Sequence, residues 1–307
     1  MKYANKYSIP TSIVEEVFTL IKDCETISDI PFSKIEKINT SFFRDNSVLN
    51  VLENIDGIVS FNFEIDPTLA LKNKIILNAA IFHLVNSAIY NPVRESQSNL
   101  PYTTYKASAD NPDKLKQAGI KFYSPDQKLG YHNDVFIENE KYFIPKYVSL
   151  TNLFIGYNNP GNFYYINQNI WEKFDDLFTQ GEGKRFKFKV TPVVRESDLS
   201  QPVITSPSQD WTLVPVFWKN SSGTKFVFSN GELKDNEDTT IITELKQSLL
   251  DNPIKILVPQ ADNQVIVFRN DIGFHSRDIF REQYIMEGTT RLFLRAVSKD
   301  SIDLPLI

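Results

Sequence analysis

Two of the three histidines in the chain stand where an imidazole can serve as a metal ligand. His132 is followed two positions later by Asp134, and residues two apart in an extended chain point to the same side. His275 supplies a second, distant imidazole, whereas His83 lies inside a long helical pattern without a second ligand nearby, and we interpret it as structural. Two imidazoles and one carboxylate suit Fe(II) and leave three coordination positions open, enough for a bidentate oxo-acid and O2.

An arginine on a predicted strand follows the second histidine in the sequence. Arg291 lies sixteen residues after His275, in a strand pattern whose alternation places Arg291, Phe293 and Arg295 on one face. A guanidinium forms two parallel hydrogen bonds with a carboxylate, such as the distal carboxylate of 2-oxoglutarate. Arg291 is a candidate for that anchor, with a surface strand arginine as the alternative, and we expect Arg295 to be a surface arginine.

Composition excludes several classes of protein. The 307 residues carry a formal net charge of -5, which argues against nucleic acid as the main partner. Cys24 is the only cysteine, so there is no internal disulfide and no cysteine-based zinc or redox site. The longest apolar run, 79–90, contains polar residues and is too short to span a membrane. We expect a soluble, cytoplasmic protein with a small-molecule partner; the oligomeric state is not indicated.

The spacing of apolar residues predicts a mainly β fold with flanking helices, of the α+β class. Helical spacing is found at 12–25, 31–55, 67–90, 169–178 and 239–250. Strand patterns are found at 57–65, 147–157, 163–166, 186–194, 212–218, 225–228, 254–258, 265–268 and 291–297. Many short strands separated by Pro, Gly and Asn turns favour an antiparallel barrel or jelly roll over a parallel sheet.

We predict one domain over residues 1–307, because β-rich domains of this size are common. A helical region, 1–56, precedes a jelly-roll core, 57–307, which carries the last three predicted helices as inserts. The segment 91–130 has little periodicity and is expected to be irregular.

The order of these candidate residues resembles the pattern of Fe(II)- and 2-oxoglutarate-dependent oxygenases: a His-x-Asp pair, a distant histidine, then an arginine on the last strand. The context, 268–270 ahead of 275–277 and ending in 291–295, looks like the clavaminate synthase-like, TauD-related branch, which includes hydroxylases of free amino acids. The resemblance covers about 120–297, and more thinly the chain from residue 57.

The resemblance implies that His132, Asp134 and His275 bind iron, that Arg291 binds 2-oxoglutarate, and that the core is a double-stranded β-helix. It implies a dioxygenase that uses Fe(II), 2-oxoglutarate and O2 to hydroxylate an unactivated C–H bond of a free L-amino acid, with release of succinate and CO2. Many members have Glu where this chain has Asp134. Related halogenases have Gly or Ala there, so an intact carboxylate favours hydroxylation.

Several substrates stay open. In relatives that act on basic amino acids, acidic residues in a turn before the last core strands bind the cationic side chain. The comparable turn here has Ser229 in place of an acid, and Glu232 or Asp235 can substitute, so a basic amino acid such as lysine is a candidate. One alternative is the same chemistry on another small metabolite or a carrier-bound aminoacyl group. A further alternative is a non-catalytic jelly-roll binding protein.

Overall fold

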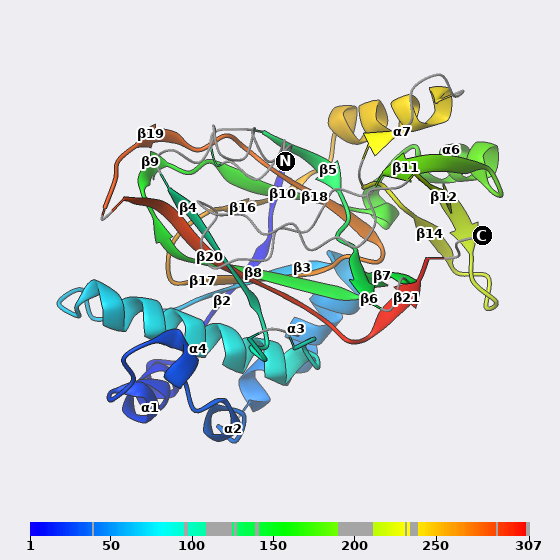
Figure 1. Cartoon of the computed structure of the whole chain (residues 1–307). Helices are drawn as coiled ribbons and strands as arrows, with labels where there is room; N and C mark the ends of the chain where they lie inside the picture. The colour runs from blue at the N-terminus through cyan, green and yellow to red at the C-terminus, as the bar shows by residue number, and fades with distance from the viewer. Residues whose placement is uncertain are drawn as a thin grey trace.

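Two large β-sheets with helices on the outside form the framework of the protein (Figure 1). The computed structural model describes residues 1–38, 40–94, 98–108, 125, 128–138, 141–189, 211–230, 232–233, 239–286 and 288–304. The predicted class, mainly β with flanking helices, is confirmed.

The first sheet carries two of the histidines. Its strand order is β1 (Lys2–Tyr3), β16 (Ile256–Pro259), β10 (Asn162–Asn167), β18 (Gly273–Arg277) and β5 (Leu129–His132). All neighbours are antiparallel except β1 and β16. The register of β18 on β5 places His275 opposite His132.

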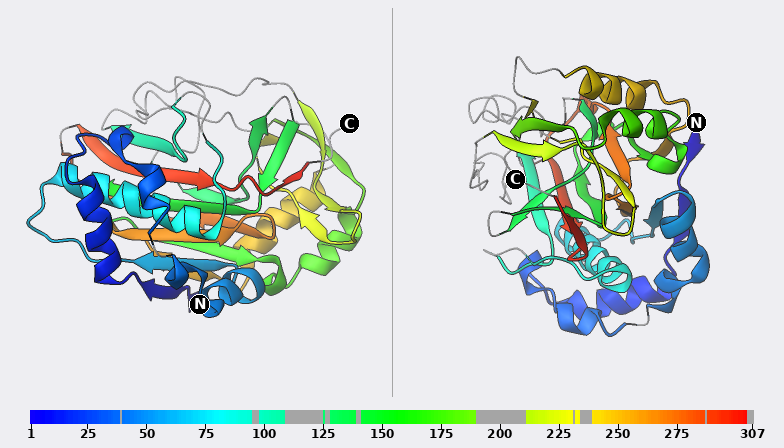
Figure 2. Two further views of the ribbon diagram at one scale, coloured as in Figure 1. Left: turned by 90° about the horizontal axis from the view of Figure 1, so that it is seen from below. Right: turned by 90° about the vertical axis from the view of Figure 1, so that its right-hand side faces the viewer.

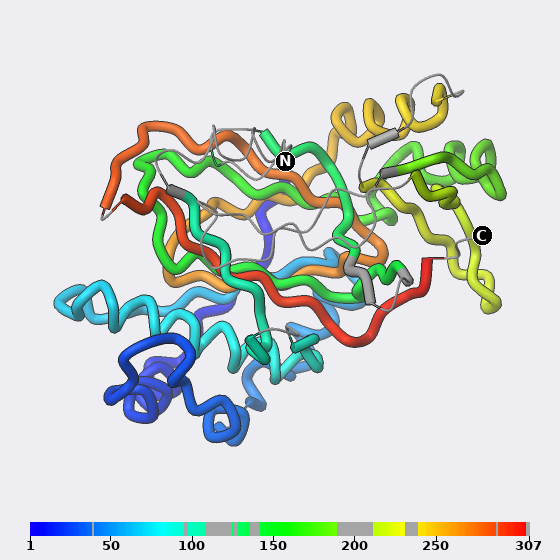
Figure 3. The backbone as a smooth tube through the Cα atoms, viewed as in Figure 1, coloured from blue at the N-terminus to red at the C-terminus, as the bar shows by residue number. Residues whose placement is uncertain are grey.

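The second sheet carries the candidate arginine. Its strand order is β2 (Asn5–Ser8), β3 (Ile58–Asn62), β17 (Gln264–Arg269), β8 (Tyr147–Ile155), β20 (Thr289–Val297) and β4 (Thr103–Ser108). Figure 3 shows β20, in red, running between β8 and β4. Leu292, Leu294 and Ala296 pack into the core beneath this sheet, as the predicted alternation requires.

A shared apolar core joins the two sheets. Phe163 and Tyr165 of β10 pack with Val148 of β8 and Ile266 and Phe268 of β17, and all five are buried. Each such side chain stabilises the fold by roughly 1.5–3 kcal/mol relative to leaving it exposed. This core fixes the separation of the sheets and therefore the distance between groups that face each other across it.

Helix α4 (Leu71–Ile89) covers the outer face of the second sheet, and α1 (Thr11–Ile21) packs against α4 (Figure 2). Helix α4 is buried along most of its length because it packs between that sheet and α1. It begins four residues later than predicted, since the Asp66 carboxylate accepts hydrogen bonds from Thr68 and forms a turn there. Among the described residues, no helix has the length and apolarity needed to cross a bilayer.

The helical pattern predicted over 31–55 is present, but not as one continuous helix. The chain instead forms short elements: α2 (Phe32–Ile35), η2 (Ser41–Arg44), α3 (Asn46–Asn50) and a π-helical segment, η3 (Val51–Ile55). Asp45 accepts a hydrogen bond from the Ser47 backbone and begins α3, so the helical spacing is interrupted by a capping residue. The segment expected to be irregular, 91–130, contains β4 and the start of β5.

A second core lies beside the first sheet and includes α6 (Phe174–Gly181) and α7 (Thr240–Asp251), both predicted within a few residues. The elements that remain are η1 (Ile27–Asp29), η4 (Gln168–Ile170), β6 (Phe136–Glu138), β7 (Lys141–Pro145), β9 (Tyr157–Asn159), β11 (Arg185–Lys189), β12 (Thr212–Pro215), β13 (Phe217–Lys219), β14 (Lys225–Val227), β15 (Glu232–Leu233), β19 (Arg281–Gln283) and β21 (Ser301–Asp303). Gly156 lies between β8 and β9, and only glycine fits there because a Cβ would lie 2.6 Å from the carbonyl oxygen of Tyr284 and 2.7 Å from that of Thr290.

His83 is a buried residue of α4, and the Glu36 carboxylate lies 3.0 Å from its Nε2. Burial lowers the pKa of His83 to about 4, although Glu36 opposes the shift. Between about pH 4 and 6.5, His83 is therefore protonated less in the folded protein than in the unfolded chain. We expect this site to stabilise the fold fully above that range, and to lose about 3 kcal/mol as pH falls through 4. Urea unfolding at several pH values should show that the free energy of unfolding falls less steeply with decreasing pH in His83→Gln than in the wild type. The same pH dependence in both proteins would contradict this.

Candidate metal centre

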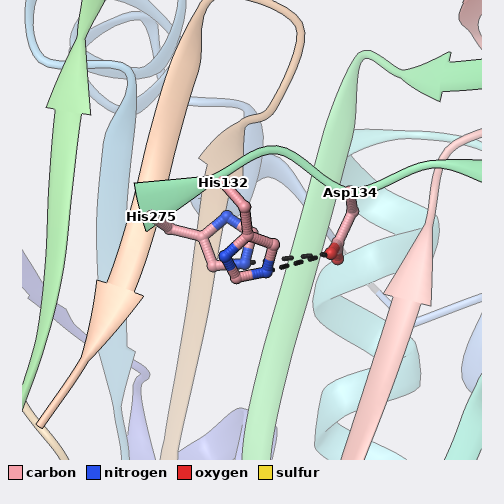
Figure 4. A group of neighbouring side chains, drawn as sticks. All are labelled: His132, Asp134 and His275. Atoms are coloured by element: carbon pink, nitrogen blue, oxygen red, sulfur yellow. Dashed lines mark ion pairs between the residues drawn. The ribbon is translucent and has the colours of Figure 1, made fainter. Parts of the chain in front are cut away.

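Three potential ligands converge at one end of the two sheets. His132 is the last residue of β5, Asp134 follows it, and His275 is central in β18. The Oδ1 atom of Asp134 lies 3.6 Å from Nε2 of His132 and 3.9 Å from Nε2 of His275 (Figure 4). Each residue offers one ligand atom, and these atoms all lie within 4.8 Å of one another. The structure thus brings together the three residues that the sequence singled out.

Both imidazoles are arranged to offer a lone pair. The Nδ1 atom of His132 lies 2.9 Å from the carbonyl oxygen of Gly130; Nδ1–H donates to it, so Nε2 carries the lone pair. His275 is buried between Phe163 and Phe268. Burial, and next the proximity of His132, lowers the pKa of His275 well below 6.5, so this imidazole is neutral at physiological pH.

Asp134 is held as a carboxylate by a neighbouring arginine. Burial favours its protonation, but Arg295 and His132 outweigh burial and hold the pKa of Asp134 well below its usual range. The Nε atom of Arg295 lies 2.9 Å from Oδ2 of Asp134, which leaves Oδ1 directed at the histidines. The expectation that Arg295 is a surface residue is wrong, because it lines the same cavity as the three potential ligands.

Asn270 fixes the backbone of Asp134 from the neighbouring sheet. Its Oδ1 accepts a hydrogen bond from the Asp134 amide at 2.7 Å, and its Nδ2 donates to the Asp134 carbonyl at 2.9 Å. The same Nδ2 also donates to the carbonyl of Pro145. Asn270 is fully buried, so these bonds have no competition from water.

Asn270→Ala is therefore expected to weaken metal binding without removing a ligand. Outer-shell partners of metal ligands contribute roughly 10- to 100-fold in affinity, and we expect a loss in that range for Fe(II). Anaerobic metal titration measures it, and circular dichroism checks that the variant is folded. An exposed amide on a helix, Gln247→Ala, is the control. Unchanged Fe(II) affinity in folded Asn270→Ala would show that the hydrogen bonds of Asn270 to the Asp134 backbone do not contribute to metal binding.

A cavity of about 360 Å³ opens beside the three side chains. Residues from both sheets line it, including Tyr105 of β4, Leu150 of β8 and Arg291, Phe293 and Arg295 of β20. This volume is in the range of small-molecule sites. The alternation predicted for 291–297 is thus realised, with its polar face directed into the cavity.

Arg291 is a buried cation in the wall of this cavity. Its Nε donates to Oδ1 of Asn152 at 2.9 Å, and its guanidinium lies over the rings of Phe280 and Phe293. Burial and the nearby Arg277 lower its pKa well below the usual value. A guanidinium nevertheless stays protonated at neutral pH. Among the described residues no carboxylate pairs with Arg291, so an anion entering the cavity would offset the cost of burying this charge.

Several contributing residues gave no sign of their individual roles in the sequence. Asn270, Asn152 and Arg277 are isolated polar residues in or beside strands, and their roles depend on contacts between distant segments. Of the acids considered for substrate binding, Asp235 lies outside the described residues, and only the backbone of Glu232 is described.

No protein-family model matches the sequence, and no curated protein matches it. Solved structures do match in fold. Asparagine oxygenase, in complex with Fe(II), 2S,3S-3-hydroxyasparagine and succinate, has a TM-score of 0.65 at 13% identity, covering 95% of this chain and 93% of that one.

The non-heme iron oxygenase OrfP is also similar. With Fe, succinate and (3S)-hydroxy-L-Arg it has a TM-score of 0.60 at 10% identity, covering 96% of this chain and 94% of that one. With Fe and alpha-ketoglutaric acid its TM-score is 0.59 at the same identity. This protein therefore has the fold of the non-haem iron oxygenases, as the resemblance in sequence implied.

Proposed function

We propose that this protein is a dioxygenase that uses Fe(II), 2-oxoglutarate and O2 to hydroxylate an unactivated C–H bond of a free L-amino acid. One observation carries the proposal: two imidazoles and a carboxylate converge in a cavity whose wall contains the buried cation Arg291. The donor set fits Fe(II), because it offers nitrogen and oxygen without thiolate and leaves one side open to the cavity. Structural neighbours that act on asparagine and arginine support an amino acid substrate.

In the proposed mechanism, His132, Asp134 and His275 hold iron and Arg291 holds the distal carboxylate of 2-oxoglutarate. Together with O2, the bound iron and oxo-acid supply oxidation of a C–H bond, with succinate and CO2 as the other products. Arg295 keeps Asp134 ionised and occupies its second oxygen, so that Asp134 presents Oδ1 alone to the metal. Phe163 and Phe268 hold the His275 ring in place. No side chain need act as a general base.

The same proposal includes a double-stranded β-helix core within a single domain spanning residues 1–307, and a cytoplasmic location. Two sheets that share one core and surround the cavity at one end support the β-helix. A basic substrate such as lysine is one form of the proposal, but Asp134 is the only carboxylate among the described residues that line the cavity.

The test is succinate formation by anaerobically purified protein after addition of Fe(II), 2-oxoglutarate and air, with each free L-amino acid in turn. Mass spectrometry should detect a product that has gained one oxygen atom with one of them. If iron and 2-oxoglutarate bind but no amino acid is oxidised, another metabolite or a carrier-bound aminoacyl group becomes the better substrate. If neither binds, the oxygenase proposal fails and a binding protein remains.

A further inference from the structure

The described lining of the cavity is rich in positive charge. Arg277, Arg291, Arg295 and Lys246 all line it, against the single carboxylate of Asp134. Three of these cations have roles or partners within the site. Arg295 pairs with Asp134, Arg291 faces the proposed oxo-acid position, and the buried Arg277 donates to backbone carbonyls beside it. Lys246 has no such assignment.

Lys246 projects into the cavity from α7, a helix that packs against β5 next to His132. It is exposed at the cavity mouth, yet enough protein surrounds its ammonium group that burial lowers its pKa. Among the described residues no carboxylate forms an ion pair with Lys246, and no hydrogen bond holds it. This differs from Lys219 and Lys225 on nearby strands, which pair with Glu182 and Asp175.

Other residues that line the cavity are neutral. Ser229 and Asn230 line it, and the Asn230 amide donates to the Asn133 carbonyl, which fixes the turn next to Asp134. Leu250, one helical turn beyond Lys246, adds an apolar surface. Asp134 is the only carboxylate among the described residues that line the cavity, and Arg295 pairs with it. A ligand side chain that reaches Lys246 therefore meets a cation without a competing anion.

We propose that Lys246 determines substrate specificity by binding an anionic group, so that the substrate is an amino acid with an acidic side chain, such as L-aspartate or L-glutamate. This inference rests on the proposed function, because it assigns Arg291 to 2-oxoglutarate and Arg295 to Asp134, while Arg277 donates to backbone carbonyls. A charge-assisted hydrogen bond between an ammonium and a carboxylate favours the acidic side chain over its neutral amide. A lysine or arginine side chain would instead meet like charge and be disfavoured.

The test compares binding of L-aspartate, L-glutamate, their amides L-asparagine and L-glutamine, and L-lysine and L-arginine. Anaerobic calorimetry with Fe(II) and 2-oxoglutarate present measures affinity without turnover. The wild-type protein should bind an acidic amino acid more tightly than its amide. Lys246→Met should lose roughly 10- to 100-fold in affinity for the acid and little for the amide. Lys246→Glu should shift preference towards the basic amino acids.

The matched control is Glu244→Gln, which removes a charge from an exposed position of the same helix and should change none of these affinities. Tighter binding of lysine or arginine by the wild type, no binding of either acid, or unchanged acid affinity in Lys246→Met would each overturn the inference. Fe(II) and 2-oxoglutarate titrations of the same samples test the proposed function separately. If those fail, affinities measured with the metal-free protein still decide the role of Lys246.

Discussion

His132→Ala is expected to abolish Fe(II)-dependent formation of succinate and to weaken Fe(II) binding by more than the roughly 10- to 100-fold expected for an outer-shell residue. The reason is that it removes one of three ligand atoms, whereas Asn270→Ala only loosens one of them. His132 suits this test because its side chain is 19% exposed, whereas that of His275 is 6% exposed. His275→Ala should have the same effect on the metal, with an added loss of stability because its ring packs between two phenylalanines.

The third histidine provides the matched control for this prediction. His83 lies in α4, outside the group of potential ligands. His83→Gln should lower the free energy of unfolding but leave Fe(II) affinity unchanged. Anaerobic Fe(II) titration and urea unfolding of both variants separate the two effects. If His132→Ala bound Fe(II) as the wild type does, the ligand assignment would have to be abandoned.

The local part of this site is predictable, because it depends on the period of an extended chain. His132 and Asp134 lie two residues apart and face one cavity, and the residues of β20 alternate as expected. The pairing of β18 with β5 is different in kind. It depends on the register of two strands that are far apart in sequence, so the sequence could join His275 to the other two only through the small number of histidines and the likeness to a known pattern.

The residues that were missed are polar residues whose partners lie on other segments of the chain. Asn270 reaches Asp134 across the fold, and Arg295 was assigned to the surface although it pairs with Asp134. A buried polar residue in a strand gives no periodic pattern of its own, since its burial depends on those distant partners. The division of the helical region 31–55 has a related cause, because Asp45 caps a new helix, α3, that apolar spacing alone does not reveal.

Arg291→Met is expected to raise the KM for 2-oxoglutarate by about 100-fold or more, while Fe(II) affinity stays near that of the wild type. The expected size follows from the loss of two charge-assisted hydrogen bonds, each worth about 1.5–3 kcal/mol. Arg291→Lys keeps the charge but cannot form two parallel hydrogen bonds, so its KM for 2-oxoglutarate should lie between those of the wild type and Arg291→Met. Arg281→Met, at an exposed position of β19, is the control and should leave the KM unchanged.

The same variant tests which part of the oxo-acid Arg291 contacts. 2-Oxobutanoate has the keto-acid group that binds a metal but lacks the distal carboxylate, so Arg291→Met should bind it as the wild type does, and only 2-oxoglutarate should lose affinity. Thermal unfolding measures the same contact without turnover. Because 2-oxoglutarate stabilises the folded protein to which it binds, it should raise the melting temperature of the wild type and raise that of Arg291→Met much less. Equal losses for both oxo-acids would place Arg291 near the metal-binding end instead and would remove it as the anchor of the distal carboxylate.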